Sequence, residues 1–221
     1  MGRTAFAVVI CVFLAVPAAA GITVEVSGND CIFFAGQNSP ISVPTGWTAG
    51  DYYGDLTDPR VMPTVVDITG FDGTISMTAS GSWDHTTSPI HGPDGYVGSD
   101  PTHPQYLEFG ISAIDNSNLS ALVGVFLTDA APDPSARPAN LIVGTSDMTT
   151  PLLQQGFLIG SSLENVVVPV GATRLFLGLN NGFEWTNNSG HVDVTITPVP
   201  GAVLLGMLGL GAAGLKLRKR A

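Results

Sequence analysis

A short segment near the end of the chain, residues 180–190, is rich in asparagine. It reads Asn-Asn-Gly-Phe-Glu-Trp-Thr-Asn-Asn-Ser-Gly, with four asparagines in eleven residues. It lies between the apolar run 174–179 and the alternating segment 191–196. Calcium takes several oxygen ligands in proteins, among them Asn side chains and backbone carbonyls. Asn, Ser and Gly are also common turn residues, so the composition fits both a calcium-binding loop and a plain turn.

A second set of polar residues contains three histidines and three aspartates. These are His85, His91 and His103 with Asp84, Asp94 and Asp100. Such residues can bind zinc or act as an acid/base pair, but histidine spacings of 6 and 12 match no zinc signature. No nucleophile elbow, phosphate loop or His-Glu-x-x-His motif occurs. The separation in space of a carboxylate pair for glycoside hydrolysis is not visible in a sequence, so that alternative stays open, but we expect no enzyme.

The elements that must position these residues are predicted to be β-strands. Segments 22–26, 74–80 and 192–196 alternate apolar and polar residues, as half-buried strands do. Segments 122–127 and 166–168 are continuously apolar, as expected in the interior of a sandwich. The 27 Gly and 16 Pro interrupt these runs at short intervals, and no long amphipathic helix is present. We therefore expect an all-β fold, an antiparallel β-sandwich or jelly roll.

Three stretches between the predicted strands are long and irregular. They comprise residues 38–64, 84–106 and 129–151. Loops of this length in a compact domain often carry function.

The charge of the chain is unevenly distributed. Eight Lys and Arg stand against 18 Asp and Glu, and most of the basic residues lie at the two ends. The central region is therefore strongly acidic and would repel phosphates, so we expect no nucleic acid partner.

The amino-terminal residues 1–20 are predicted to be a secretory signal peptide cleaved by signal peptidase. A short basic start is followed by the apolar run 4–16 and by Ala18-Ala19-Ala20, the order typical of such signals. Cys31 is then the only cysteine of the mature chain. Its apolar surroundings predict that it is buried.

The carboxy-terminal residues 198–221 resemble a PEP-CTERM sorting signal. A Pro-rich break at Pro198, Pro200 and Gly201 precedes an apolar run and a basic cluster at 216–220. The resemblance implies processing by exosortase after transient insertion in the inner membrane through residues 202–217, in a bacterium with an outer membrane. The break has no Glu between its prolines, which leaves the cleavage position undefined. A plain membrane anchor, in keeping with the positive-inside rule, is the alternative.

The body of the chain, residues 21–197, resembles the LecA-like galactose-binding lectin family. The resemblance covers 74–197 and is carried by residues 171–196, the run 121–127, Gly92-Pro-Asp-Gly95 and His103-Pro-Gln105. It implies a small jelly roll with one calcium at its rim, to which sugar hydroxyls bind directly.

Carried over by position, the family's calcium ligands fall on Asn187 and Asn188, with a backbone carbonyl near Thr86. Asn181 stands where the family usually has Asp, and Glu184 is a candidate to restore the lost charge. Fewer charged ligands predict weaker calcium binding. The sugar contacts fall on His103 and Gln105. Trp185 is expected either to stack on a sugar or to cap the edge of the core.

The predicted function is calcium-assisted binding of carbohydrate, such as the cell's own exopolysaccharide. The protein would be exported and then held at the cell surface or in the extracellular matrix. The alternative is a structural surface or biofilm matrix protein with no ligand.

Overall fold

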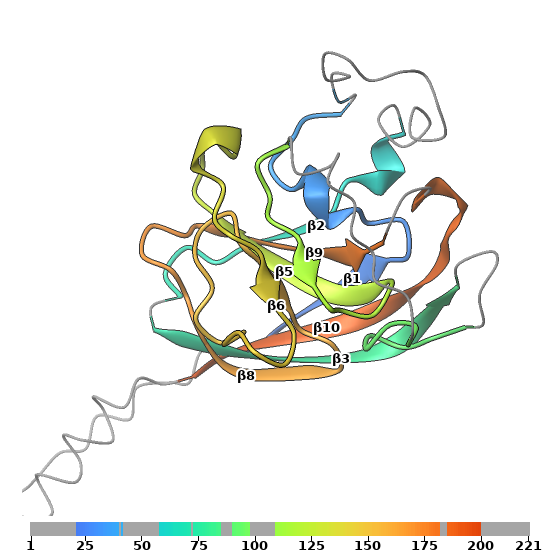
Figure 1. Cartoon of the computed structure of the whole chain (residues 1–221). Coiled ribbons are helices and arrows are strands. Elements are labelled where there is room, and N and C mark those ends of the chain that lie inside the picture. Colours follow the sequence, from blue (N-terminus) through green and yellow to red (C-terminus); the bar gives the residue numbers. More distant parts are fainter. Residues whose placement is uncertain are drawn as a thin grey trace, which may run out of the picture.

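The computed structural model describes residues 21–39, 41, 58–71, 73–84, 90–97, 109–181 and 185–199. Eight strands of this part form two four-stranded sheets, with orders β1-β10-β3-β8 and β2-β9-β5-β7 (Figure 1). Their bounds are β1 Ile22–Ser27, β2 Thr64–Asp67, β3 Thr74–Asp84, β5 Ala121–Leu127, β7 Gly156–Leu158, β8 Ser162–Val167, β9 Arg174–Asn180 and β10 Ser189–Val199. Short 3-10 turns η1 Ile32–Phe34, η2 Pro59–Val61, η4 Pro134–Ala136 and η5 Trp185–Asn187 lie between them.

The strand pairs are nested along the chain. β1 pairs with β10, β2 with β9, β3 with β8 and β5 with β7, all antiparallel. The pairs β10–β3 and β5–β9 complete the two sheets. This is the strand order of a jelly roll, so the expected all-β antiparallel sandwich is confirmed.

The sheet β1-β10-β3-β8 has one buried face and one exposed face. Along β10, Val192, Val194 and Ile196 are fully buried, and the residues between them are exposed or half-buried. Because side chains in a strand point alternately to opposite faces, this sheet bears out the alternating pattern. β8, at the edge of the sheet, does not follow the prediction. Val166 is buried but Val167 is 42% exposed, since only one face of the strand meets the core.

The sheet β2-β9-β5-β7 is buried on both faces at its two central strands, and β5 and β9 have no exposed residue. Its edge strand β2 is exposed on one face, at Val65 and Asp67. Leu122 and Phe126 pack into the core between the two sheets. Val123 and Val125 belong to a second core with Cys31, η1 and Trp185. A strand covered on both sides needs apolar residues at successive positions, which explains the continuous run 122–127. Cys31 is buried, as expected.

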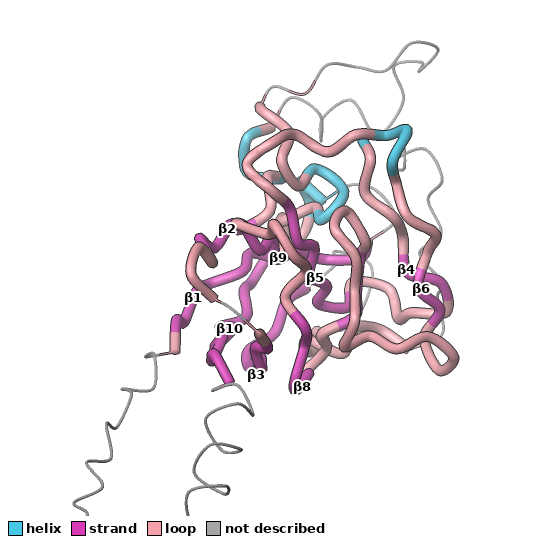
Figure 2. The backbone as a smooth tube through the Cα atoms, turned by 90° about the vertical axis from the view of Figure 1, so that its left-hand side faces the viewer, coloured by secondary structure: helices cyan, strands magenta, loops and turns pink. Residues whose placement is uncertain are grey.

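The long connection 129–151 contains regular structure that its composition did not predict. Besides η4 it holds β6 Leu141–Ile142, which pairs in parallel with β4 Ile114–Asp115 (Figure 2). This small two-stranded sheet is the parallel exception among the described strand pairs.

Strand β10 extends beyond the domain end expected at residue 197. Pro198 and Val199 are still paired with Ile75 and Thr74 of β3. A proline lacks an N–H and is tolerated where one side of the strand has no partner. The pairing with β1 stops at Ile196, so β10 is an edge at this point.

Several predicted features lie outside the described residues. They are the segments 1–20 and 200–221, with Pro200 and Gly201, and the site residues Thr86, His103, Gln105 and Glu184. Among the described residues, no helix has the length and apolar character needed to cross a membrane.

Candidate functional site

The Asn-rich connection between β9 and β10 begins in the core. Asn180, the last residue of β9, is 1% exposed and donates a side-chain hydrogen bond to Ser117 Oγ. Its carbonyl accepts a hydrogen bond from Ser120 N at 2.8 Å. Asn181 is also 1% exposed. The first two asparagines therefore lie inside the protein, although turn residues are usually found at the surface.

The second asparagine pair is split between surface and core. Asn187 is exposed and Asn188 is buried. Asn188 Nδ2 donates to Gly28 O at 2.8 Å. That contact fixes the orientation of the amide, because a carbonyl accepts only from its NH2 group. Asn188 Oδ1 is buried and accepts no hydrogen bond from any described residue.

A residue that the sequence analysis did not single out connects the loop to the turn after β1. Asn29 Nδ2 donates to Trp185 O at 2.6 Å and to Asn188 O at 3.0 Å. The backbone adds Gly28 N to Gly190 O at 2.9 Å and Asn188 N to Trp185 O at 3.1 Å. The short polar segment Ser27-Gly28-Asn29-Asp30 is recognisable in the sequence as a turn. The sequence does not show that Asn29 contacts Trp185, which lies 156 residues further along the chain.

Trp185 packs inward and does not present a face to solvent. Its side chain is fully buried, with ring centroids 6.4 Å from Phe33 in an edge-on arrangement and 6.2 Å from Phe34. The expectation that Trp185 stacks on a sugar is therefore wrong for this structure, and the alternative of a core-edge residue holds. Burying a large apolar ring stabilises the folded state more than leaving it exposed to solvent does.

A buried carboxylate lies next to the same turn. Asp30 is 4% exposed, and its Oδ2 accepts hydrogen bonds from Thr64 Oγ1 at 2.7 Å, Thr64 N at 3.1 Å and Ser27 N at 3.2 Å. Removal from water raises the pKa of Asp30 from 3.8 to about 6, against the lowering effect of these donors. Its backbone carbonyl accepts from Leu179 N at 2.7 Å, so Asp30 ties the end of β9 to the turn.

The chemistry of the loop can be tested against a calcium ion. A buried carbonyl oxygen with no donor calls for a ligand such as a water or an ion, and Asn188 Oδ1 is such an atom. It fits the hard oxygen ligands that calcium takes. The described loop residues Asn181, Asn187 and Asn188 are all neutral, so a site built from them lacks the carboxylates that raise calcium affinity.

The histidine cluster considered from the sequence is represented by His91 alone among the described residues. His91 is half-buried, and its backbone pairs with that of Trp83 through two hydrogen bonds of 3.1 Å. A different group comes together on the exposed face of the β1–β10 pair. The ligand atoms of Glu25, His191 and Asp193 lie within 4.8 Å of one another. All three are exposed, and His191 Nε2 is 3.8 Å from Glu25 Oε2; nothing else at this cluster points to a metal.

Comparisons with known proteins add little to this geometry. No protein family and no curated protein matches the chain. A similar solved structure is described as the EclA N-terminal domain, a PllA-like lectin. The alignment covers 80% of this chain and 95% of that chain, with 10% identity and a TM-score of 0.36. A TM-score this low does not establish a shared fold, so the jelly-roll assignment is based on the strand order alone.

Proposed function

We propose that this protein binds carbohydrate with the help of calcium held at the β9–β10 loop. The observation that carries the proposal is the buried oxygen Asn188 Oδ1, which has no donor among the described residues. The resemblance of residues 171–196 to the LecA-like family supports the same loop. The proposal assigns Asn181 and Asn187 as further oxygen ligands, with a backbone carbonyl near Thr86.

The described residues around the proposed site hold the loop and its amide groups in position. Gly28 O orients the Asn188 amide, and Asn29 fixes the carbonyls of Trp185 and Asn188. Trp185 supports the loop from beneath. Bound calcium would supply positions at which sugar hydroxyls replace water. His103 and Gln105 are proposed to orient the ring, and no bond is broken, so the proposed protein is not an enzyme.

We further propose that the protein is exported and sorted. The support is the order of segments at the two ends, a signal-peptide pattern in 1–20 and a PEP-CTERM-like pattern in 198–221. Signal peptidase and exosortase are the proposed processing enzymes. The final location would be the cell surface or the extracellular matrix, where exopolysaccharide is available. Mass analysis of the protein recovered from the outside of the cell would test both cleavages.

The calcium proposal is tested by thermal unfolding of the purified full-length protein with calcium and with a chelator. A ligand that binds only the folded state stabilises it by about 2.7 kcal/mol at 100 times its Kd. For a domain of this size that raises Tm by several degrees. Asn187→Ala should reduce the rise, whereas Asn38→Ala, another exposed asparagine, should not. No rise at millimolar calcium would contradict the proposal.

Restoring the missing charge is the sharper test. Asn181→Asp places a carboxylate at a position that is 1% exposed. Without calcium this variant should unfold at a lower temperature, because taking a charge out of water is costly. With calcium its Tm should rise more than that of the unaltered protein, because charge strengthens calcium binding. A variant that is destabilised equally in both conditions would argue against a metal at this loop.

The alternative is a structural surface protein with no ligand, and one observation favours it. The hydrogen bonds of Asn29 and Asn188 bind the loop to the turn after β1, so these asparagines already have a role in folding. If calcium changes neither the unaltered protein nor Asn181→Asp, this structural role accounts for the loop.

A further inference from the structure

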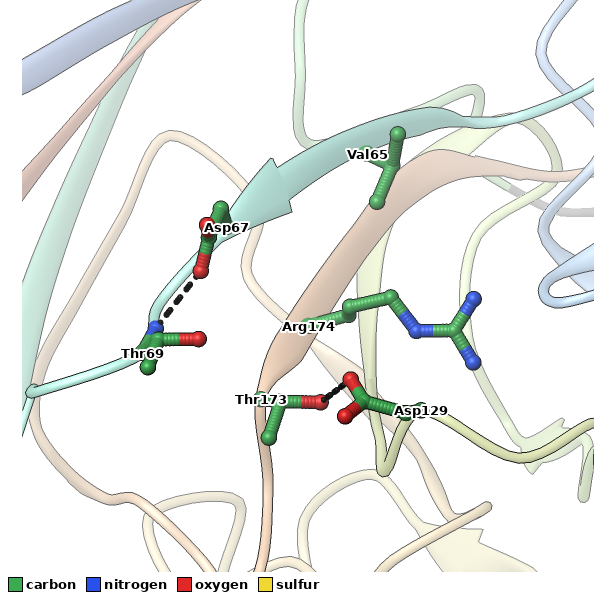
Figure 3. Close-up of a pocket in the computed structure, with 6 residues that line it drawn as sticks. All are labelled: Val65, Asp67, Thr69, Asp129, Thr173 and Arg174. Atoms are coloured by element: carbon green, nitrogen blue, oxygen red, sulfur yellow. Dashed lines mark hydrogen bonds between the residues drawn. The ribbon is translucent and has the colours of Figure 1, made fainter.

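A second polar region lies at the other end of β9, where β2, β5 and β9 meet. A pocket of about 340 Å³ lies between these elements, and Figure 3 shows the residues that line it. Its lining residues are Val65, Asp67, Thr69, Asp129, Thr173 and Arg174. No part of the function proposed above uses them.

Arg174 is held in place on one wall of the pocket. Its Nε donates to Thr128 O at 2.9 Å, and its Nη2 donates to Thr128 O and to Ala130 O. The guanidinium carbon lies 5.1 Å from the ring centroid of Phe176. These contacts leave Nη1 without an acceptor among the described residues, so this donor group is available to a ligand.

Two carboxylates that line the pocket are also held by hydrogen bonds. Asp129 Oδ1 accepts from Thr173 Oγ1 at 2.6 Å, and Asp67 Oδ1 accepts from Thr69 N at 2.8 Å (Figure 3). Asp129 Oδ2 accepts no hydrogen bond from the described part of the chain, and Asp67 is held by the backbone and side chain of Thr69 alone. The pocket therefore offers two fixed acceptors and one fixed donor group, and such preorganisation reduces the entropy lost on binding.

The balance of charges indicates the chemistry of the ligand. Two carboxylates disfavour phosphate and other anions, and the guanidinium disfavours a cation. A neutral molecule with neighbouring hydroxyls satisfies both, because a hydroxyl donates to a carboxylate and accepts from a guanidinium. Val65, which is 53% exposed, adds an apolar surface for C–H groups. The volume lies at the small end of the range for ligand pockets, which fits a single sugar ring.

We propose that this pocket binds a neutral monosaccharide unit without calcium. β9 has seven residues, so the pocket lies about 20 Å from the Asn-rich loop at about 3.3 Å per residue. If the calcium-assisted site also binds sugar, as the function proposed above requires, one domain would hold two saccharide units at opposite ends of strand β9. It would then link neighbouring polysaccharide chains.

Saturation-transfer NMR on the full-length protein, with a chelator present, tests the pocket. The probes are the methyl glycosides of glucose, galactose and mannose at millimolar concentration. At least one should bind, and Asp129→Asn and Arg174→Lys should weaken it about tenfold, the loss expected for one charge-assisted hydrogen bond. Glu164→Gln, an exposed carboxylate on β8, is the matched control and should change nothing.

The outcomes separate the two sites. Binding that needs calcium and is lost in Asn187→Ala but kept in Asp129→Asn would overturn the pocket and leave the calcium proposal standing. Binding in chelator that is lost in Asp129→Asn supports the pocket whatever calcium does. Absence of binding by all three glycosides in chelator would overturn the pocket. An unchanged Tm for Asp129→Asn shows that a loss of binding is not a loss of fold.

Discussion

Strand β9 has a polar region at each end, and the two regions are built differently. At the carboxyl end, Asn180, Asn181 and Asn188 are each at most 6% exposed. At the amino end, Asp67 and Asp129 are exposed and line a pocket. The first region uses neutral amides inside the protein, and the second uses charges in contact with water.

The difference follows from the cost of burial. A buried amide is tolerated when its hydrogen bonds are made, whereas a buried charge must be paired as well. The Asn-rich loop can therefore be part of the core and still keep one oxygen for a ligand. Exposed charges contribute little to stability in general, so we expect the carboxylates of the pocket to be changeable with small effects on the fold. Variants at the two ends should accordingly separate stability from binding.

The largest effect is expected from Trp185→Ala at the loop end. The ring is fully buried against Phe33 and Phe34, and truncating a buried Trp costs about 3–5 kcal/mol. Chemical denaturation would measure the loss. Val170→Ala, at a side chain that is 98% exposed, should change the free energy of unfolding by about 0.5 kcal/mol or less. A similarly small value for Trp185→Ala would show that the loop is not part of the core.

The next effect is a pH dependence caused by Asp30. Burial raises its pKa from 3.8 to about 6, so between these values the folded state keeps a proton that the unfolded state has lost. The unfolded state then binds fewer protons, and the free energy of unfolding falls as pH rises. The contribution is fully present below pH 4 and about 3 kcal/mol smaller above pH 6.

Urea denaturation of the unaltered protein and Asp30→Asn at pH 4 and pH 7 would measure it, and the variant should lose this difference. Asp58, whose pKa is lowered by hydrogen bonds from Arg60, provides the control. Asp58→Asn should leave the pH effect of Asp30 intact. An identical pH profile for Asp30→Asn and the unaltered protein would contradict the assignment.

A moderate effect is expected from Asn29→Ala. The change removes the donor that serves the carbonyls of both Trp185 and Asn188. Trp185 O keeps its hydrogen bond from Asn188 N, but Asn188 O loses its side-chain donor. A part-buried acceptor left without its donor costs about 1 kcal/mol. Asn38→Ala, an exposed position, is the matched control. If the two variants unfold at the same temperature, the contact between the loop and the turn after β1 is not a stabilising one.

The smallest effect on stability is expected at the pocket. Thr173→Val removes the hydroxyl that donates to Asp129 Oδ1, and at an exposed carboxylate this should cost about 0.5 kcal/mol or less. The same variant should bind methyl glycosides in chelator more weakly, because Asp129 is no longer held in position. A large fall in Tm would mean that the pocket end, like the loop end, is part of the stable core.

Much of the fold could be read from the order of residues. The alternation in 74–80 and 192–196 predicted β3 and β10, because side chains on a strand point to opposite faces. The apolar run 122–127 predicted a strand in the interior of the sandwich, and the structure shows that this strand, β5, is buried along its whole length. Short strands such as β2 and β7 were not predicted, since three or four residues hold too little of the pattern.

The candidate site was only partly predictable. The chain itself marked residues 180–190 as a loop rich in side-chain oxygens, because composition and local spacing lie along the sequence. Only the tertiary structure decided that Asn29 holds this loop, that Trp185 turns into the core and that β2, β5 and β9 together form a pocket. The physical reason is that strand alternation specifies which face a side chain takes but not which strand lies beside it. Contacts between residues more than a hundred positions apart, such as that of Asn29 with Trp185, depend on how the two sheets pack.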